Sequence, residues 1–202
     1  MMRTVCTLQS FVAVAAAGML LQLAAPTVRA QPTQGVSKDE IVIGTIQDLS
    51  GPVSPFGKAA RNGLQLRVDE INEQGGIHGR RIRLIVEDNA YDPKRAVLAA
   101  QKLVNQDKVF LIASHIGTPM NNAAMPVMFE KGVINFFPLS AGREMYDPPN
   151  KLKFASVASY YDTMRMNVAR LYKEKGAKNA CILYQDDDYG LEVVRGAEQG
   201  LK

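Results

Sequence analysis

The segment Ile41-Val42-Ile43-Gly44-Thr45-Ile46 is short, apolar and rich in β-branched residues, which is typical of a buried strand in a parallel sheet. Similar apolar runs recur along the chain, and segments with helical spacing of apolar residues separate them. Because strands and helices alternate, we expect a doubly wound α/β fold with a parallel sheet covered by helices on both faces. The predicted strands are 41–46, 81–87, 109–113, 133–137 and 179–184, with a short extended piece at 154–157.

The predicted helices are bounded by residues that favour helix ends. The first helix runs to about Gln74, where Gly75-Gly76 stops it because glycine adopts the left-handed conformation of a C-cap. Asp92-Pro93 opens the second helix, with aspartate as N-cap and proline at the first helical position. The remaining helices are predicted at 119–131, about 162–175, and 189–201.

The first thirty residues have the pattern of a secretory signal peptide. Arg3 lies in a short cationic start, residues 11–25 are apolar except for Gln22, and Val28-Arg29-Ala30 supplies small residues where signal peptidase cleaves. The alternative is a membrane anchor, but a helix that spans a bilayer needs about 20 apolar residues and this run is shorter. We therefore expect export and cleavage after Ala30.

Composition excludes several classes of protein. The chain has 202 residues, of which 47% are hydrophobic and 22% charged, and this excludes global disorder. The formal net charge is +4, but the basic residues are scattered, so nucleic acid is not an expected partner. Cys6 lies in the predicted signal peptide, which leaves Cys181 without a disulfide partner. We expect Cys181 to be buried in the strand predicted at 179–184.

The fold class predicts where a ligand binds. In open parallel sheets, ligands lie beyond the carboxyl ends of the strands, where loops and helix N-termini converge. The segments that follow the first four predicted strands are 48–57, 89–92, 114–118 and 138–142.

The loop Ser114-His115-Ile116-Gly117-Thr118-Pro119 has two interpretations. The Thr118 hydroxyl can cap the following helix, and Pro119 pre-sets its first turn. The free N–H groups at the same helix end also favour an anion such as a carboxylate. The residues alone favour the cap, and the two roles are compatible.

Catalytic and metal-binding patterns are weak. The glycine-rich segment 75–79 follows a helix and precedes a strand, the reverse of a dinucleotide-binding loop. His78 and His115 have no neighbouring residues with metal-ligand spacing. The acids of Asp186-Asp187-Asp188 are expected beside a helix N-terminus on dipole grounds and lack the spacing of a calcium loop. We therefore predict no catalytic residue, no metal and no cofactor.

The segment Asn72-x-x-Gly75-Gly76-Ile77-x-Gly79 follows an amphipathic helix and is the most specific motif in the chain. The other notable segments are Ile41-x-Ile43-Gly44, Leu49-Ser50-Gly51-Pro52, Gly57, Asn62-Gly63, Asp88, Asp92-Pro93-x-x-Ala96 and Asp188-Tyr189-Gly190. Taken in order, these segments resemble the branched-chain amino-acid/amide-binding family of periplasmic substrate-binding proteins of ABC transporters. The resemblance spans residues 37–202.

The resemblance implies a protein that is not an enzyme and that has a type I periplasmic-binding-protein architecture, with two α/β lobes joined by a hinge. Ligand is held in the cleft between the lobes, and a membrane permease recognises the closed form. On this basis we expect a signal peptide at 1–30, an incomplete N-terminal lobe at 31–158 and the truncated start of a second lobe at 159–202. Because the family needs two complete lobes, the 202-residue chain alone is expected to bind ligand poorly.

The resemblance also implies ligand-binding positions. Phe56 resembles the aromatic residue that lines the cleft after the first strand, and Tyr189 the one that closes it from the second lobe. Thr118 matches the hydroxyl that holds the carboxylate or carbonyl of the ligand. Leu139 falls where a main-chain group contacts the ligand, and Ser140 or Ala141 where a second hydroxyl is expected. The predicted set is Phe56, Ile116, Thr118, Leu139, Ser140 and Tyr189.

Two classes of function remain open at this stage. The resemblance implies a periplasmic receptor that binds an amino acid, amide, urea or aromatic acid and delivers it to an ABC permease. The alternatives are a secreted α/β enzyme, such as a hydrolase or nucleotide-binding protein, and the same binding fold used as a ligand sensor. The sequence departs from the family in two places. The cysteine pair that bridges the second and third loops is absent, with Tyr91 and Gly117 nearby, and Tyr160 and Tyr161 stand at the lobe crossing, where a small or acidic residue is common.

Overall fold

A computed structural model describes residues 33–202, and the predicted signal peptide lies outside them. The strands are β1 (Glu40–Gln47), β2 (Arg81–Asp88), β3 (Leu111–Ala113), β4 (Ile134–Phe136) and β5 (Lys153–Phe154). These five parallel strands form one sheet in the order β2-β1-β3-β4-β5. The predicted α/β fold class with a parallel sheet is confirmed.

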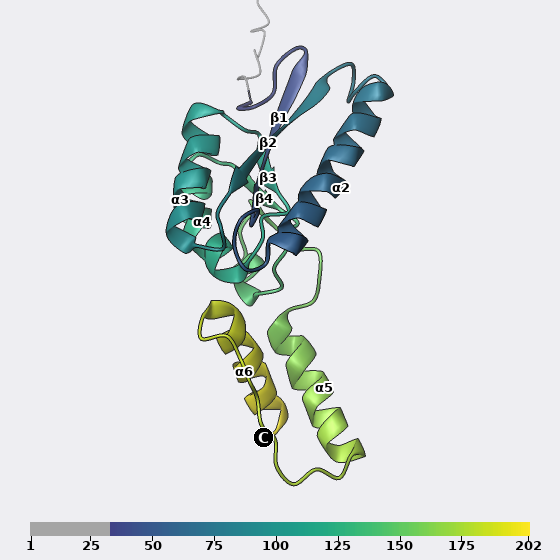
Figure 1. The fold of residues 1–202 in the computed structure, drawn as a ribbon, viewed down its shortest axis with the longest axis vertical. Coiled ribbons are helices and arrows are strands. Elements are labelled where there is room, and N and C mark those ends of the chain that lie inside the picture. Colours follow the sequence, from purple (N-terminus) through teal and green to yellow (C-terminus); the bar gives the residue numbers. More distant parts are fainter. Residues whose placement is uncertain (1–32) are drawn as a thin grey trace, which may run out of the picture. The chain divides into compact units, whose positions relative to one another are not determined.

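Helices cover both faces of this sheet. Helix α2 (Ser54–Glu73) lies on one face, whereas α3 (Pro93–Gln101) and α4 (Thr118–Glu130) lie together on the other (Figure 1). Five residues of π-helix, Lys102–Gln106, extend α3. The main hydrophobic core fills the layer between the sheet and α3 and α4. Its most deeply buried members are Ile46, Ala100, Leu103, Val104, Val109, Ile112, Ala124 and Met128.

The motif that begins at Asn72 and includes Gly75-Gly76 forms the C-terminal end of α2 and its connection to β2. The Gly76 N–H donates to the Ile71 carbonyl and closes the last turn, as the glycine pair predicts. The Asn72 side chain makes two hydrogen bonds to the backbone of Ile82 in β2. Its Oδ1 accepts from the Ile82 N–H at 2.7 Å, and its Nδ2 donates to the Ile82 carbonyl at 2.8 Å. Asn72 therefore fixes the C-terminal end of α2 against the second strand.

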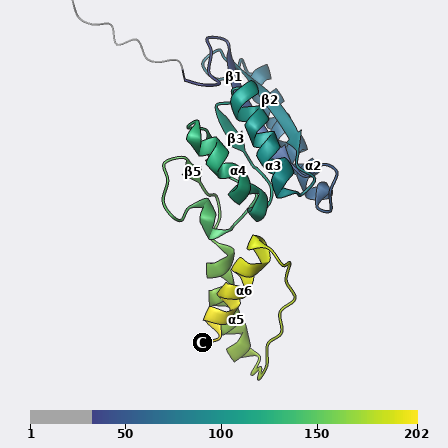
Figure 2. The same ribbon diagram turned by 90° about the vertical axis from the view of Figure 1, so that its left-hand side faces the viewer.

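Residues 159–202 contain two helices, α5 (Tyr160–Glu174) and α6 (Asp188–Gly200), which lie side by side (Figure 2). Residues 33–202 form one compact unit, so the lobe boundary at residue 158 stays a prediction. No helix in this part of the chain is long and apolar enough to cross a membrane.

The strand predicted at 179–184 is absent, and this expectation was wrong. The segment is irregular and exposed, with Leu183 99% exposed. A strand forms only where a neighbouring strand satisfies its N–H and C=O groups, and no described strand lies alongside this segment. Cys181 is consequently exposed rather than buried, as the chain has no sheet there to cover it.

Replacing Asn72 with alanine removes both hydrogen bonds to Ile82 and leaves a partly buried N–H and C=O without these partners. We expect Asn72→Ala to lower the free energy of unfolding by about 1–3 kcal/mol in urea denaturation. Asn62→Ala is the matched control, because Asn62 lies on the same helix and is exposed. Equal losses in the two variants would contradict this role for Asn72.

Candidate ligand pocket

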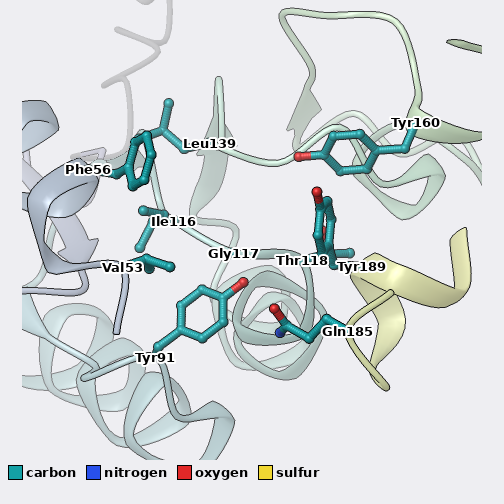
Figure 3. A pocket seen from close by; sticks show the side chains of 10 residues that line it. All are labelled: Val53, Phe56, Tyr91, Ile116, Gly117, Thr118, Leu139, Tyr160, Gln185 and Tyr189. Atoms are coloured by element: carbon teal, nitrogen blue, oxygen red, sulfur yellow. The ribbon is translucent and has the colours of Figure 1, made fainter. Parts of the chain in front are cut away.

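A cavity of about 360 Å³ lies at the carboxyl ends of the strands, where the fold class predicts a ligand site (Figure 3). Two parts of the chain form its walls. One wall consists of residues that follow β1, β2, β3 and β4, and the other consists of residues at the start of α5 and just before and within the first turn of α6. The ten lining residues are Val53, Phe56, Tyr91, Ile116, Gly117, Thr118, Leu139, Tyr160, Gln185 and Tyr189.

Two carboxylates at the strand ends hold the first two loops in place. Asp48 accepts hydrogen bonds from the backbone N–H groups of Gly51 and Val53, so the turn after β1 presents Val53 to the pocket. Asp88 accepts from the N–H groups of Leu49 and Ala90, both at 2.9 Å. It therefore ties the loop after β1 to the loop that carries Tyr91.

These contacts favour the ionised form of the Asp88 carboxyl group. Partial burial acts to raise the pKa of Asp88, but the hydrogen bonds from Ser50, Leu49 and Ala90 and the nearby Arg95 guanidinium outweigh it. The net effect lowers the pKa of this carboxyl below its usual value. Asp88 thus remains an acceptor near neutral pH, as its role in the loops requires.

Backbone pairing continues beyond β3 and β4 and forms the floor of the pocket. The Leu139 N–H donates to the His115 carbonyl at 2.9 Å, and the Gly117 N–H donates to the Leu139 carbonyl at 3.2 Å. This pairing sets Ile116 and Leu139 next to each other. The family resemblance implies a ligand contact by a main-chain group of Leu139, but both its N–H and its carbonyl are hydrogen-bonded inside the protein.

The capping role predicted for Thr118 was wrong. The N-cap of α4 is Gly117, and Thr118 is the first helical residue. Gly117 has φ +91°, a left-handed conformation that favours glycine, and a Cβ there would lie 3.1 Å from the Tyr91 ring. Thr118 therefore follows the capping position instead of occupying it.

The Thr118 hydroxyl instead contacts Ser140. The two oxygens are 2.8 Å apart, and the residues are only 1% and 5% exposed. Thr118 lines the pocket, whereas Ser140 does not and lies behind it. Ser140 Oγ also accepts the Gly142 N–H at 3.2 Å.

The other side of the pocket is aromatic. The rings of Tyr160 and Tyr189 meet edge to face with centroids 5.0 Å apart. The Tyr160 N–H donates to the Ala141 carbonyl at 2.8 Å and anchors the start of α5 beside the loop after β4. In Figure 3 the hydroxyl ends of Tyr91 and Tyr160 point toward the middle of the cavity. Burial raises the pKa of both phenols, so both keep their protons at neutral pH and are available as donors.

The start of α6 is fixed from two directions. Asp187 is its N-cap and accepts the Gly190 N–H at 3.1 Å, as expected for an acid at a helix N-terminus. Asp188 accepts a hydrogen bond of 2.9 Å from the Asn122 side chain of α4. These contacts hold Gln185 and Tyr189 at the pocket.

Residues 33–202 contain no cluster of three or more side chains that could bind a metal ion.

Five of the six residues predicted from the sequence line this pocket, and Ser140 lies behind it. Their role as ligand contacts stays a prediction. The predicted set missed five lining residues, Val53, Tyr91, Gly117, Tyr160 and Gln185. Val53, Tyr91 and Gly117 lie in loops that the fold class had placed at the ligand edge, so the signal was present. Tyr160 and Gln185 come from outside the sheet, and strand topology gives no signal for them.

His115 is fully buried directly before the pocket residue Ile116. Neither of its ring nitrogens has a hydrogen-bond partner. Burial lowers the pKa of His115 from 6.5 to about 3, because the charged form loses its hydration. The imidazole is therefore neutral in the folded protein at neutral pH.

Comparison with known proteins identifies the family. The profile of the periplasmic binding protein family matches residues 40–202, most of the chain. The chain belongs to this family. Its similarity to branched-chain amino acid-binding proteins places it in the type I group, as the sequence motifs indicate.

The relatives are named as binding proteins. The leucine-, isoleucine-, valine-, threonine- and alanine-binding protein of Pseudomonas aeruginosa is 28% identical over 172 residues, which are 83% of this chain and 44% of that protein. The chain thus spans about half the length of the curated relatives it matches.

Two solved structures are similar in fold. The fatty acid ABC transporter substrate-binding protein of Thermomonospora curvata has a TM-score of 0.75 and 28% identity, covering 84% of this chain and 43% of that one. The branched-chain amino acid transporter substrate-binding protein LivJ of Streptococcus pneumoniae, in complex with isoleucine, has a TM-score of 0.68 and 25% identity. The matched region covers 80% of this chain and 47% of the LivJ chain.

Burial of His115 predicts a dependence of stability on pH. Because its folded pKa is depressed, the unfolded chain binds a proton that the folded protein excludes once the pH falls below 6.5. We expect His115 to lower the free energy of unfolding by about 2 kcal/mol as the pH falls from ~6.5 to ~5. The slope is about 1.4 kcal/mol per pH unit. The loss continues down to pH ~3, as the folded form then accepts the proton.

The measurement is urea denaturation of the chain and of His115→Gln across this pH range. The variant should lose the part of the pH dependence that His115 causes. His78→Asn is the control, because His78 is exposed in a turn with φ +50°, which asparagine tolerates. Unchanged pH dependence in His115→Gln would contradict the assignment.

Proposed function

We propose that this protein is an extracytoplasmic solute receptor that binds a small carboxylate or amide ligand in the pocket and delivers it to an ABC permease. The predicted signal peptide supports a periplasmic location, as does membership of the periplasmic binding protein family. The permease partner and the delivery step follow from the relatives that are named as ABC transporter proteins.

The observation that carries the proposal is the Thr118 hydroxyl at the N-terminus of α4. The first N–H groups of a helix lack acceptors within the helix and carry a partial positive charge, so they favour an anion. Thr118 adds an O–H donor at the same end and is nearly buried, next to the apolar lining residue Ile116. A desolvated carboxylate needs several such donors to offset the loss of its hydration.

The named ligands of the relatives are consistent with this anchor. LivJ is described in complex with isoleucine, and the Thermomonospora curvata protein is named for fatty acids. An α-amino acid and a fatty acid differ in their bodies but share a carboxylate. A receptor that holds the carboxylate at the start of α4 leaves the rest of the pocket to select the body.

The remaining wall suits an apolar or aromatic body. Phe56, Tyr91, Tyr160 and Tyr189 supply aromatic surface that excludes water, and Gln185 supplies an amide. None of the ten lining residues is charged, so they offer no carboxylate to pair with an ammonium group. An amino-acid ligand therefore needs an ammonium partner outside these ten residues, whereas a simple carboxylic acid does not.

The test is isothermal titration of the complete product of the gene that encodes this chain. The probes are L-leucine, 4-methylpentanoate, which is leucine without its amino group, and 4-hydroxybenzoate. We expect at least one probe to bind without being consumed. Failure of all three to bind, together with hydrolysis of an ester or phosphate substrate, would favour the enzyme alternative and contradict the receptor.

Thr118→Val keeps the shape of the side chain and removes its donor. With a probe that binds, we expect about a tenfold to hundredfold loss of affinity, the range for a hydrogen bond to a charged group. Thr163→Val is the matched control, because Thr163 is exposed on α5 outside the pocket. Unchanged affinity in Thr118→Val would show that this hydroxyl does not hold the ligand.

A further inference from the structure

Ser140 is a buried polar residue that the pocket itself does not use. It is 5% exposed, does not line the cavity, and comes from the loop after β4, whereas Thr118 begins α4. The contact of 2.8 Å between their hydroxyl oxygens is therefore a tertiary contact between two loops that share the ligand edge.

The donor in this contact follows from counting protons. A hydroxyl has one proton to donate and two lone pairs that accept. Ser140 Oγ already accepts the Gly142 N–H, so its own proton needs an acceptor inside the protein, and Thr118 Oγ1 is within reach. If Thr118 donated instead, the Ser140 proton would be left buried behind the pocket without a hydrogen bond from those contacts, which is costly.

The methyl group of Thr118 restricts the side chain further. A Cβ on Gly142 would lie 2.7 Å from Thr118 Cγ2, so the absence of a side chain at Gly142 makes the space that this methyl occupies. A β-branched side chain has few allowed rotamers, and filling this space selects among them. The methyl and the hydroxyl of Thr118 are thus both held by residues 140–142.

We propose that Ser140 is a positioning residue that donates its hydroxyl proton to Thr118 and thereby leaves the Thr118 proton free to point into the pocket. Thr118 is then presented to a ligand as a donor rather than as an acceptor. This suits a carboxylate, which accepts hydrogen bonds but does not donate them. The inference rests on the proposed function, because it assigns to Ser140 an effect on ligand affinity that acts only through Thr118.

The test is a double-mutant cycle on the complete gene product, with affinity for L-leucine, 4-methylpentanoate and 4-hydroxybenzoate measured by titration. Ser140→Ala should weaken binding of the probe that binds by about threefold to tenfold, since the Thr118 hydroxyl loses its fixed orientation. In the Thr118→Val background, Ser140→Ala should change affinity by less than about twofold, because there is no longer a proton to direct.

Ser140→Cys serves as the conservative variant, with a weaker donor at nearly the same volume, and should fall between wild type and Ser140→Ala. Thermal melting of every variant shows whether it is folded. If Ser140→Ala does not fold, the affinity of Ser140→Cys is compared with that of the wild type instead.

The outcomes separate the two proposals. No binding of any probe by the wild type would overturn the proposed function and this inference with it. Full affinity in Thr118→Val would overturn this inference but not the receptor function, because the probe would then bind without the Thr118 hydroxyl. Weak binding in Thr118→Val with full affinity in folded Ser140→Ala or Ser140→Cys would overturn only the positioning role. An equal loss from Ser140→Ala in both backgrounds would also overturn it, because Ser140 would then act independently of Thr118.

Discussion

The parallel alignment of the strands is the constraint on which the rest of the structure depends. Strand β1 is hydrogen-bonded to β2 over its whole length and to β3 on the other side, so the sheet is built outward from it. Because every strand runs in the same direction, the loops that follow β1 to β4 all leave from one edge. Residues that are far apart in the sequence, such as Val53 and Leu139, are brought to one pocket by this geometry alone.

Polar contacts behind the pocket complement this alignment. Asp48 and Asp88 hold the first two loops through backbone N–H groups, and Ser140 contacts Thr118 between the third and fourth. The lining itself is mostly aromatic and aliphatic. Buried polar groups thus set the shape of the loops, whereas mainly aromatic and aliphatic side chains face the cavity.

Local patterns predicted most elements because their causes are local. The segment 41–46 lies within β1, and Asp92 caps α3 by accepting the Arg95 N–H. The segment 179–184 has the same apolar character, yet it is not a strand in residues 33–202. Apolar, β-branched composition makes a segment suitable for a sheet, but pairing requires another strand alongside, and a local pattern does not contain that information. Cys181 is exposed for the same reason.

The sequence by itself determined the fold class and the edge of the sheet at which the pocket lies, because periodicity and the alternation of strands and helices follow from local chemistry. The five predicted residues that lie around the cavity came from the family resemblance of its motifs. Only the tertiary structure decided the chemistry at that edge. It placed Gly117, not Thr118, at the helix cap, put Ser140 behind the pocket, and added Tyr160 and Gln185 from outside the sheet. The orientation of a hydroxyl depends on the atoms that other loops bring within hydrogen-bond distance, and those contacts exist only once the chain is folded.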